Sequence, residues 1–390
     1  MRVLVAHHLL VRVGGGERVS SVLIDELLRQ GYEVAVATTC RADVAELFER
    51  YFGRQLPARI RSYSLFPRFY PILGIYQRLT SFIPVRTAIR RENPHIVFID
   101  HEIYKPLRRV LEGRRLVHYV HFPWNPRLAD RNWKLYGMTL PEKYRHFPFN
   151  IYWRGYIELQ RSVSVDENFA DVICANSHFT AQAVKTVWDR EATVIYPPVS
   201  VNDFYPLQPS EKEDIAVHLG RISSEKRIEE AITAIAGCET DTKLVIIGGL
   251  IPANIPYLMG LKKLVKDLRL EGRVKFYTDA PFKFVRNMLA RAKILMSAMH
   301  FEHFGISVCE GLASGCVPII HRSGGPLEII DHGRYGFSYI TPKEAAKFID
   351  KLVGDTALFS KMSKAAVERA RAFDESVFRK RMMEIVEKLK

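Results

Sequence analysis

Short apolar runs alternate with amphipathic helical patterns along this chain of 390 residues, and no other feature restricts its possible folds as much. A run of four or five apolar residues is typical of a strand that helices cover on both faces. In the first half such runs lie at 3–6, 34–37, 95–99, 116–120, 172–175 and 194–196. The pattern starts again with runs at 215–219, 243–247, 274–277, 294–296 and 317–320. We therefore predict an α/β fold with two Rossmann-like, doubly wound parallel sheets.

A proline-rich, polar stretch separates the two series of strands. Tyr196-Pro197-Pro198 ends the first series, and residues 200–214 are mostly polar. Such a composition is typical of a linker between domains. We predict one domain over residues 1–198 and a second over 199–375, facing each other across a cleft. Open α/β sheets bind ligands outside the carboxyl ends of their strands, so we expect the functional site at those edges.

Cysteine content and hydropathy disfavour several classes of protein. The five cysteines are scattered and form no C-x-x-C pair, so neither a structural zinc site nor a disulfide framework is expected. Residues 1–6 are typical of a strand and not of a signal peptide. No apolar run approaches the roughly 18 residues that a membrane-spanning helix needs. A reducing, cytoplasmic compartment fits this composition best.

Positive charge is concentrated in one part of the chain. The formal net charge is +14, and residues 51–162 contain 20 Lys and Arg against 7 Asp and Glu. This excess predicts an anionic partner: nucleic acid, an acidic membrane surface or an acceptor linked through a diphosphate. A solvated basic face without a partner is the alternative. Within this stretch, residues 64–89 are rich in apolar and arginine side chains but interrupted by prolines, and they form either ordinary core or a membrane-facing surface.

Glycines and a histidine follow strands of the first domain. Gly14-Gly15-Gly16 opens the first helix, where glycine lets a ligand approach the backbone and leaves N–H groups free for a phosphate. This is not a G-x-G-x-x-G motif, and the second strand ends in Thr38-Thr39-Cys40 without an acidic residue, so NAD binding is disfavoured. A tight turn alone would also explain these glycines. His121 ends a predicted strand at the expected cleft, where it is either a ligand-binding residue or an ordinary surface histidine.

In the second domain, glycines and cations follow the first two strands. Gly220 and Arg221 end the first strand, and Lys226 follows five residues later. Glycine permits close approach of a diphosphate, whose negative charge Arg221 and Lys226 can neutralise. The alternative is a surface loop with ordinary basic residues. Gly248, after the next strand, permits similar close approach or simply forms a turn.

The most specific signal is a pair of glutamates, Glu302 and Glu310, eight positions apart around Phe304-Gly305-Ile306. An apolar strand precedes the pair and a helical pattern of small residues follows it. One carboxylate is therefore expected in the loop and the other about one turn inside the helix. A helix start attracts phosphate, and carboxylates accept hydrogen bonds from sugar hydroxyls. The alternative is a pair of solvated charges, but apolar residues flank Glu310, so a partly buried carboxylate that needs a partner is expected.

Together these motifs resemble those of family 4 (group 1) glycosyltransferases of the GT-B fold. The resemblance rests on the E-x7-E pair at 302 and 310, on the spacing G-R-x-x-x-x-K over 220–226, and on His121. Residues 14–19, 118–123 and 302–306 are most similar to Alg11-type α-1,2-mannosyltransferases. Those enzymes extend lipid-linked oligosaccharides from GDP-mannose at a cytosolic membrane face.

The resemblance implies a retaining hexosyltransferase that takes mannose from GDP-mannose and transfers it to a membrane-associated, lipid-linked or glycan acceptor. It assigns the acceptor to residues 1–198 and the nucleotide sugar to 199–375, and it implies that the final helix, 376–390, packs back on the first domain. It implies a peripheral protein on the inner face of a membrane. No cofactor is expected, and in the absence of a D-x-D pair no metal ion, because Arg221 and Lys226 would stabilise the departing diphosphate instead.

Individual roles follow from the same resemblance. His121 and Glu302 would orient the transferred sugar, Glu310 would bind the ribose, and backbone groups near Tyr277 would meet the base. The residues expected to contact the nucleotide sugar are Gly15, Gly16, Gly220, Arg221, Lys226, Gly248, Tyr277, Glu302, Phe304, Gly305, Ile306 and Glu310.

Three alternatives remain open at this point. A soluble family 4 transferase would use a UDP-sugar and a free sugar or sugar-phosphate acceptor. A nucleic-acid-binding protein would use the basic stretch, although no known nucleic-acid motif supports it. An epimerase of the same fold is disfavoured by the motif pattern.

Overall fold

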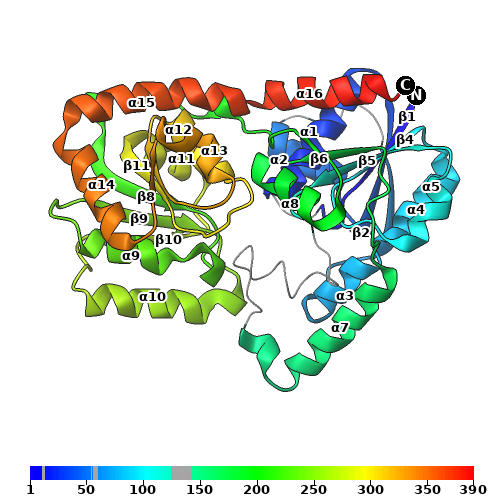
Figure 1. Cartoon of the computed structure of the whole chain (residues 1–390), viewed down its shortest axis with the longest axis horizontal. Helices are drawn as coiled ribbons and strands as arrows, with labels where there is room; N and C mark the ends of the chain where they lie inside the picture. The colour runs from blue at the N-terminus through cyan, green and yellow to red at the C-terminus, as the bar shows by residue number, and fades with distance from the viewer. Residues whose placement is uncertain (11–13, 54, 56–59, 124–141) are drawn as a thin grey trace. The chain divides into compact units, whose positions relative to one another are not determined.

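The computed structural model describes residues 1–10, 14–53, 55, 60–123 and 142–390. The chain divides into two compact units (Figure 1). The N-terminal unit contains Met1–Pro198 together with Ser376–Lys390, and the C-terminal unit contains Val199–Glu375. Residues 54, 56–59 and 124–141 of the basic stretch lie outside the described residues.

A parallel sheet forms the centre of the N-terminal unit. Within the described residues its strand order is β3-β2-β1-β4-β5-β6-β7. The strands are β1 (Arg2–Ala6), β2 (Glu33–Cys40), β3 (Arg61–Phe66), β4 (Ile96–Ile99), β5 (Arg115–Val120), β6 (Val172–Ala175) and β7 (Thr193–Val194). Every neighbouring pair is parallel, which confirms the predicted doubly wound sheet.

Helices cover both faces of this sheet. They are α1 (Gly15–Arg29), α2 (Val44–Phe52), α3 (Gly74–Leu79), α4 (Phe82–Glu92), α5 (Arg108–Leu111), α7 (Phe149–Val163), α8 (His178–Trp188) and α16 (Glu375–Lys388), with 3-10 turns η1 (Pro71–Leu73), η2 (Lys105–Leu107) and η3 (Glu142–Arg145). Alternate residues of β1 point to opposite faces, so Val3 and Val5 join a core with α1 while Leu4 and Ala6 join a core with α4 and α8. The apolar run without polar alternation reflects this burial on both faces.

The final helix, α16, belongs to the N-terminal unit, as predicted (red in Figure 1). Its apolar residues Phe378, Met382, Ile385 and Val386 are buried in the same core as Val3 and Val5 of β1.

Residues 64–89 contain both core residues and exposed apolar side chains. The end of β3 leads into η1 and α3, and α4 follows with Pro84 in its first turn, where proline is tolerated. Val85, Ala88 and Ile89 of α4 are core residues. In contrast, Ile72 and Leu73 of η1 are exposed.

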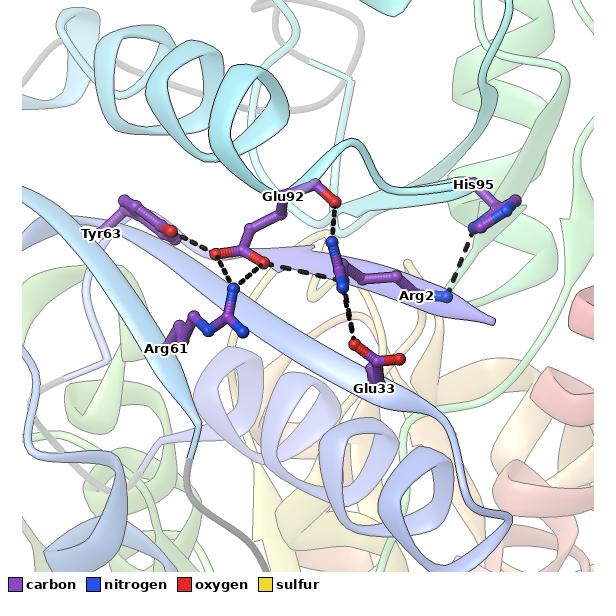
Figure 2. A network of polar contacts seen from close by, with 6 residues as sticks. All are labelled: Arg2, Glu33, Arg61, Tyr63, Glu92 and His95. Atoms are coloured by element: carbon purple, nitrogen blue, oxygen red, sulfur yellow. Dashed lines mark hydrogen bonds and ion pairs between the residues drawn. The ribbon is translucent and has the colours of Figure 1, made fainter.

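A network of charged groups ties β1, β2 and β3 to the end of α4 (Figure 2). Glu92 is buried and accepts hydrogen bonds from Arg61 Nη1, at 2.9 and 3.1 Å, and from the Tyr63 hydroxyl. The Arg2 guanidinium donates to the Glu92 carbonyl and to the Glu33 carboxylate, the latter at 2.8 and 3.2 Å. These residues lie near the amino ends of the strands, so the network supports the sheet edge opposite the one where ligands are expected.

A second parallel sheet forms the centre of the C-terminal unit, in the order β10-β9-β8-β11-β12-β13. The strands are β8 (Glu213–Leu219), β9 (Lys243–Gly248), β10 (Val274–Thr278), β11 (Ala292–Ser297), β12 (Val317–His321) and β13 (Phe337–Tyr339). The helices are α9 (Ile228–Ala236), α10 (Ile255–Asp267), α11 (Phe282–Arg291), α12 (Ile306–Ala313), α13 (Pro326–Ile329), α14 (Pro342–Gly354) and α15 (Thr356–Ala370), with 3-10 turns η4 (Val201–Asp203), η5 (Pro209–Glu211), η6 (Ser224–Lys226), η7 (Pro252–Asn254), η8 (Asp331–Gly333) and η9 (Arg371–Phe373). Among the described residues of the whole chain, no helix has the length and apolar character needed to cross a bilayer.

Candidate functional site

The predicted motifs of the C-terminal unit meet at one edge of its sheet. Gly220 follows β8, Gly248 ends β9, and residues 300–305 follow β11. Because β9, β8 and β11 are adjacent and parallel, their carboxyl ends lie side by side. This is the edge at which open α/β sheets bind ligands.

Lys226 and Glu302 form an ion pair at this edge. The Lys226 ammonium donates a hydrogen bond to Glu302 Oε2, and the two side chains are only 18% and 17% exposed. Burial would raise the pKa of the Glu302 carboxyl, but the charge and hydrogen bond of Lys226 hold that pKa below its usual value. The structure therefore brings together a carboxylate and a cation that lie 76 positions apart in the sequence.

The glycine at 248 has a steric reason. A Cβ atom on Gly248 would lie 1.8 Å from the carbonyl oxygen of Gly220, so only glycine permits this approach of the two strand ends. A backbone hydrogen bond of 3.0 Å from Gly220 N to Ile247 O holds the loops together. Beside them, a Cβ on Gly220 would touch the Lys226 side chain at 3.6 Å.

A second pair of glycines fixes the loop that carries Glu302. Gly325 N donates to the Glu302 carbonyl at 2.8 Å, and the Ser323 hydroxyl accepts from Phe301 N at 2.8 Å. A Cβ on Gly324 would lie 2.3 Å from the Glu302 carbonyl oxygen. The loop after β12 therefore supports the backbone of Glu302 at close range.

Helix α12 begins directly after this loop. Gly305 is its N-cap, with φ at +107°, a conformation that favours glycine. Glycine has no side chain that could cap the helix. The Val308 N–H donates to the Gly305 carbonyl at 3.0 Å, so the N–H groups available to an anion are those of Ile306 and Ser307. Glu310 lies in the second turn and is half-buried, as the flanking apolar residues predicted.

Three predicted residues stand apart from the Lys226–Glu302 pair. Phe304 is buried against Phe373, with ring centroids 5.8 Å apart, so only its backbone is available to a ligand. Tyr277 lies on the edge strand β10 and packs against Phe284 at 4.6 Å. Arg221 is largely exposed and forms an ion pair with Glu225 at 3.3 Å.

Sequence reasoning missed several histidines near the same sheet edge. His218, two residues before Gly220, is buried, and burial and the Lys226 charge lower its pKa to about 4. His300 and His321 stack with ring centroids 3.5 Å apart, and His300 Nε2 lies 2.9 Å from Glu230 Oε1. Their positions at or just after strand ends were the available signal.

In the N-terminal unit, a buried carboxylate brings strand-end residues together. Asp100 follows β4, and both of its carboxylate oxygens lie 2.7 Å from His7 Nδ1. The Ser20 hydroxyl of α1 donates to Asp100 Oδ2 at 2.5 Å. His121, after β5, has its Nε2 at 3.9 Å from the same oxygen. Asp100, His7 and Ser20 were not predicted, because nothing in the local sequence of each shows that β1, β4 and β5 are neighbours.

Gly16 allows helix α1 to start beside this cluster. A Cβ atom on Gly16 would lie 3.5 Å from both His121 Nε2 and His7 Cε1, at van der Waals contact. Gly15 is the first residue of the same helix. The glycine turn predicted from the sequence therefore adjoins the predicted histidine.

Electrostatics keep Asp100 charged. Burial would raise its pKa, but the charge of His7 and the contact with His121 hold it far below the usual range. Burial would lower the pKa of His7, and the Asp100 charge and hydrogen bond raise it above the usual value instead. The result is a buried anion with imidazoles around it, able to orient hydroxyl groups of a ligand.

Family comparisons agree with this geometry. The family model described as "Glycosyltransferase Family 4" matches residues 13–203, and the family model described as "Glycosyl transferases group 1" matches residues 202–372. This chain belongs to the group 1, family 4 glycosyltransferases. The two matches follow one another along the chain and together contain both strand-edge clusters described above, except for His7.

Curated relatives of this family 4 chain are mannosyltransferases. The GDP-Man:Man(3)GlcNAc(2)-PP-Dol alpha-1,2-mannosyltransferase of Dictyostelium discoideum is 23% identical, with 82% of this chain and 66% of that protein aligned. The human protein of the same name is 29% identical over 96% of this chain and 84% of its own length. The alpha-1,3/1,6-mannosyltransferase alg-2 of Neurospora crassa is 25% identical over 97% and 88%. The chain spans only part of the length of the first curated relatives it matches. The aligned share of those relatives is 66%, 48% and 46%.

Solved structures share the fold. Sucrose-phosphate synthase from Thermosynechococcus elongatus aligns with a TM-score of 0.76 at 18% identity, covering all of this chain and 98% of that one. Anabaena HepE, solved in complex with UDP-glucose, aligns with a TM-score of 0.71 at 18% identity, covering both chains completely. With the two parallel-sheet units, these neighbours confirm the GT-B fold predicted for this family 4 member.

Proposed function

We propose that this chain is a retaining mannosyltransferase that moves mannose from GDP-mannose to a lipid-linked glycan acceptor. The observation that carries the proposal is the Lys226–Glu302 pair at the strand edge of the C-terminal unit, beside the start of α12. Curated relatives that align with nearly the whole chain are named as mannosyltransferases, which supports the choice of sugar.

Departure of the nucleoside diphosphate is the step that these residues assist. The Lys226 ammonium has three donors, so it can hold Glu302 and a phosphate oxygen at the same time. The exposed Arg221 and the N–H groups at the start of α12 add positive potential where the leaving group gains charge. Glu302 accepts a hydrogen bond from the transferred sugar, and Glu310 from the ribose. No metal ion and no cofactor is part of this proposal, and turnover should persist in the presence of a chelator.

The N-terminal unit is assigned to the acceptor. Its basic stretch suits an acceptor that carries a diphosphate, and His121 is assigned to orienting the transferred sugar. Retention is assigned to attack on the same face from which the diphosphate leaves. We place the protein on the cytoplasmic face of a membrane as a peripheral protein, where a lipid-linked acceptor is accessible.

A thermal-shift panel of nucleotide sugars tests the donor. A ligand at 100 times its Kd stabilises the folded state by about 2.7 kcal/mol, so the true donor should raise the melting temperature measurably. We expect GDP-mannose to do so at lower concentration than UDP-glucose or UDP-galactose. A larger rise in melting temperature with a UDP-sugar would contradict GDP-mannose as the donor and favour the alternative of a UDP-sugar transferase.

Vesicle flotation and a transfer assay test the acceptor. The protein should float with vesicles that contain anionic lipid and transfer mannose to a polyprenyl-diphosphate-linked glycan. Transfer to a free sugar or sugar phosphate by a protein that stays in solution would instead support the soluble alternative. Binding to any polynucleotide with a steep salt dependence, without sugar transfer, would support the nucleic-acid alternative.

A further inference from the structure

The N-terminal unit contains a cavity of about 380 Å³ that the proposed chemistry does not yet use. It lies at the carboxyl ends of β1 and β2, where His8 and Thr39 line it. Phe69, two residues before η1, and Gly74 and Arg78 of α3 line it as well. Tyr144 of η3 and Tyr152 of α7 also line the cavity. Figure 1 shows α3 and α7 side by side, and the two helices are in contact.

Arg78 gives the cavity a positive charge that no ion pair holds among the described residues. Its side chain is exposed, and within the described residues its guanidinium makes neither a hydrogen bond nor an ion pair. The charge of Glu102 acts on Arg78 from further away, without an ion pair between them. An arginine without a carboxylate partner, in a concave site, is a typical binding group for phosphate.

A buried hydroxyl lines the same cavity. The Thr39 side chain is 2% exposed, and its Oγ1 has no hydrogen-bond partner among the described residues. A buried hydroxyl without a partner costs free energy, which a ligand oxygen would recover. Beside it, burial and the Arg78 charge keep the pKa of His8 well below its usual value, so its ring is neutral and adds no competing cation.

Exposed apolar side chains lie on the segments that line the cavity. We call them the apolar rim: Phe69, Ile72, Leu73, Phe147, Phe149 and Ile151. Ile72 is 83% exposed, Phe147 78% and Ile151 61%. The Tyr152 hydroxyl donates to the Ile72 carbonyl at 2.5 Å, which joins η1 to α7. Scattered exposed apolar residues are common, but a group on two connected segments around a cationic cavity indicates a binding surface for an amphiphile.

We propose that this cavity binds the diphosphate of a polyprenyl-linked acceptor, with Arg78 on a phosphate oxygen and the first isoprene units on the apolar rim. The proposal rests on the proposed function, because it names where that acceptor's lipid end is held. Charge complementarity supports this occupant: most residues that line the cavity belong to the stretch that carries 20 basic against 7 acidic residues. The rim enters the outermost part of the bilayer, and the exposed Arg68 next to Phe69 meets anionic headgroups.

Titration calorimetry with farnesyl diphosphate, a soluble polyprenyl diphosphate, tests the proposal without sugar transfer. Inorganic diphosphate and farnesol serve as probes of the two halves of the ligand. The wild-type protein should bind farnesyl diphosphate more tightly than either half. Arg78→Ala should lower the affinity for farnesyl diphosphate about tenfold or more, since a charged hydrogen bond is lost. Arg78→Lys should retain part of that affinity. The double variant Ile72→Ser/Phe147→Ser should have a lower affinity for farnesyl diphosphate, but its Arg78-dependent binding of inorganic diphosphate should not change.

Three matched variants separate this site from the rest of the molecule. Lys226→Ala removes the cation assigned to the nucleotide diphosphate, Arg154→Ala removes an exposed arginine that does not line the cavity, and Met259→Ser removes an exposed apolar side chain of α10. All three should bind farnesyl diphosphate like the wild type, and melting temperatures establish that every variant is folded. Wild-type affinity in a folded Arg78→Ala variant, no binding by the wild type, or loss of binding in Lys226→Ala instead would overturn the proposal. A protein that transfers mannose yet binds farnesyl diphosphate independently of Arg78 would contradict this inference alone, whereas binding through Arg78 without any transfer would contradict the proposed function alone.

Discussion

The ammonium of Lys226 and the carboxylate of Glu302 neutralise each other in a mostly buried position, so neither charge is left uncompensated when no ligand is bound. Removing one partner of such a pair leaves a desolvated charge, which costs more than the pair itself is worth. A ligand diphosphate therefore meets a cation that is already oriented. The site is preorganised by a contact within the protein.

The first prediction concerns the two cations after β8. Lys226→Ala and Arg221→Ala should each lower kcat by about 100-fold or more, because stabilisation of the leaving group acts mainly in the transition state. Lys263→Ala, on the exposed face of α10, is the matched control and should leave kcat unchanged. Steady-state kinetics with the donor established by the thermal-shift panel measures the effect. Wild-type turnover in both site variants would remove the assigned role of these cations.

The second prediction concerns the approach of two strand ends. Gly248→Ala places a methyl group on the backbone of Gly220 and should destabilise the fold by about 1–3 kcal/mol. Gly260→Ala, in α10, meets open space and should instead be neutral or stabilising by up to about 1 kcal/mol. Urea denaturation of both variants measures the difference. Equal stability of the two would show that the loops move apart easily.

At the scale of residues, the sequence allowed prediction of functional residues that belong to a recognisable local motif. Glu302 and Lys226 were predicted separately from strand-end motifs, and the structure joins them in one ion pair. Asp100 was missed because its partners, His7 and Ser20, are 93 and 80 positions away and only strand order brings them together. Phe304 was assigned to the ligand, but its ring packs into the core against Phe373, a contact that the local motif does not encode.

At the scale of elements, the apolar runs predicted most strands because burial on both faces produces a strong local signal. β3 (Arg61–Phe66) was not predicted, since it is an edge strand with mostly exposed side chains. Helix α7 was also missed; among its side chains only Tyr156 and Gln160 are buried. Elements with few buried side chains are hard to predict from hydrophobic patterns in the sequence.

The third prediction concerns the link between α4 and the sheet (Figure 2). Burial would raise the pKa of Glu92, but hydrogen bonds from Tyr63 and Arg61 and nearby arginine charges hold it below its usual value. A lowered carboxyl pKa stabilises the fold above the pKa of the unfolded state, about 4.3, and this contribution is lost as the pH falls through the folded pKa. Glu92→Gln should therefore destabilise the protein by about 1–3 kcal/mol at pH 7, and the difference from wild type should shrink below about pH 4.

Glu33→Gln is the matched control for this network. Glu33 also binds Arg2, but its side chain is 67% exposed, so the loss of its charge should destabilise the protein much less than the loss of the Glu92 charge. Chemical denaturation at several pH values measures both variants. A Glu92→Gln effect that does not change with pH would show that packing, and not the charge, is what Glu92 contributes.

At the scale of the whole molecule, the last segment of the chain completes the first unit. Arg379 of α16 forms ion pairs with Asp25 at 2.8 Å and with Glu26 at 3.1 Å, both on α1. The tandem pattern of apolar runs predicted two sheets correctly, and their parallel order follows from the alternation with helices. No local pattern shows which unit α16 joins, and that expectation came only from the family resemblance.

The fourth prediction concerns this returning helix. Phe378→Ala removes a side chain that is 2% exposed and should destabilise the N-terminal unit by about 3–5 kcal/mol. Val377→Ala, at a neighbouring position that is 40% exposed, should change stability by less than about 0.5 kcal/mol. Hydrogen exchange localises the effect: Phe378→Ala should reduce protection in β1 and β4 more than in β8 and β11. Equal loss in both sheets would mean that the two units unfold together.

The return of α16 also has a consequence for biosynthesis. A ribosome makes residues 199–375 before it makes α16, so the C-terminal unit has all of its sequence while the N-terminal unit still lacks Phe378 and Met382. Domains usually mature in the order of synthesis. Here we expect the reverse for the final packing step: the N-terminal unit stays incomplete, with apolar surface open to chaperones, until α16 has been made and has left the ribosome.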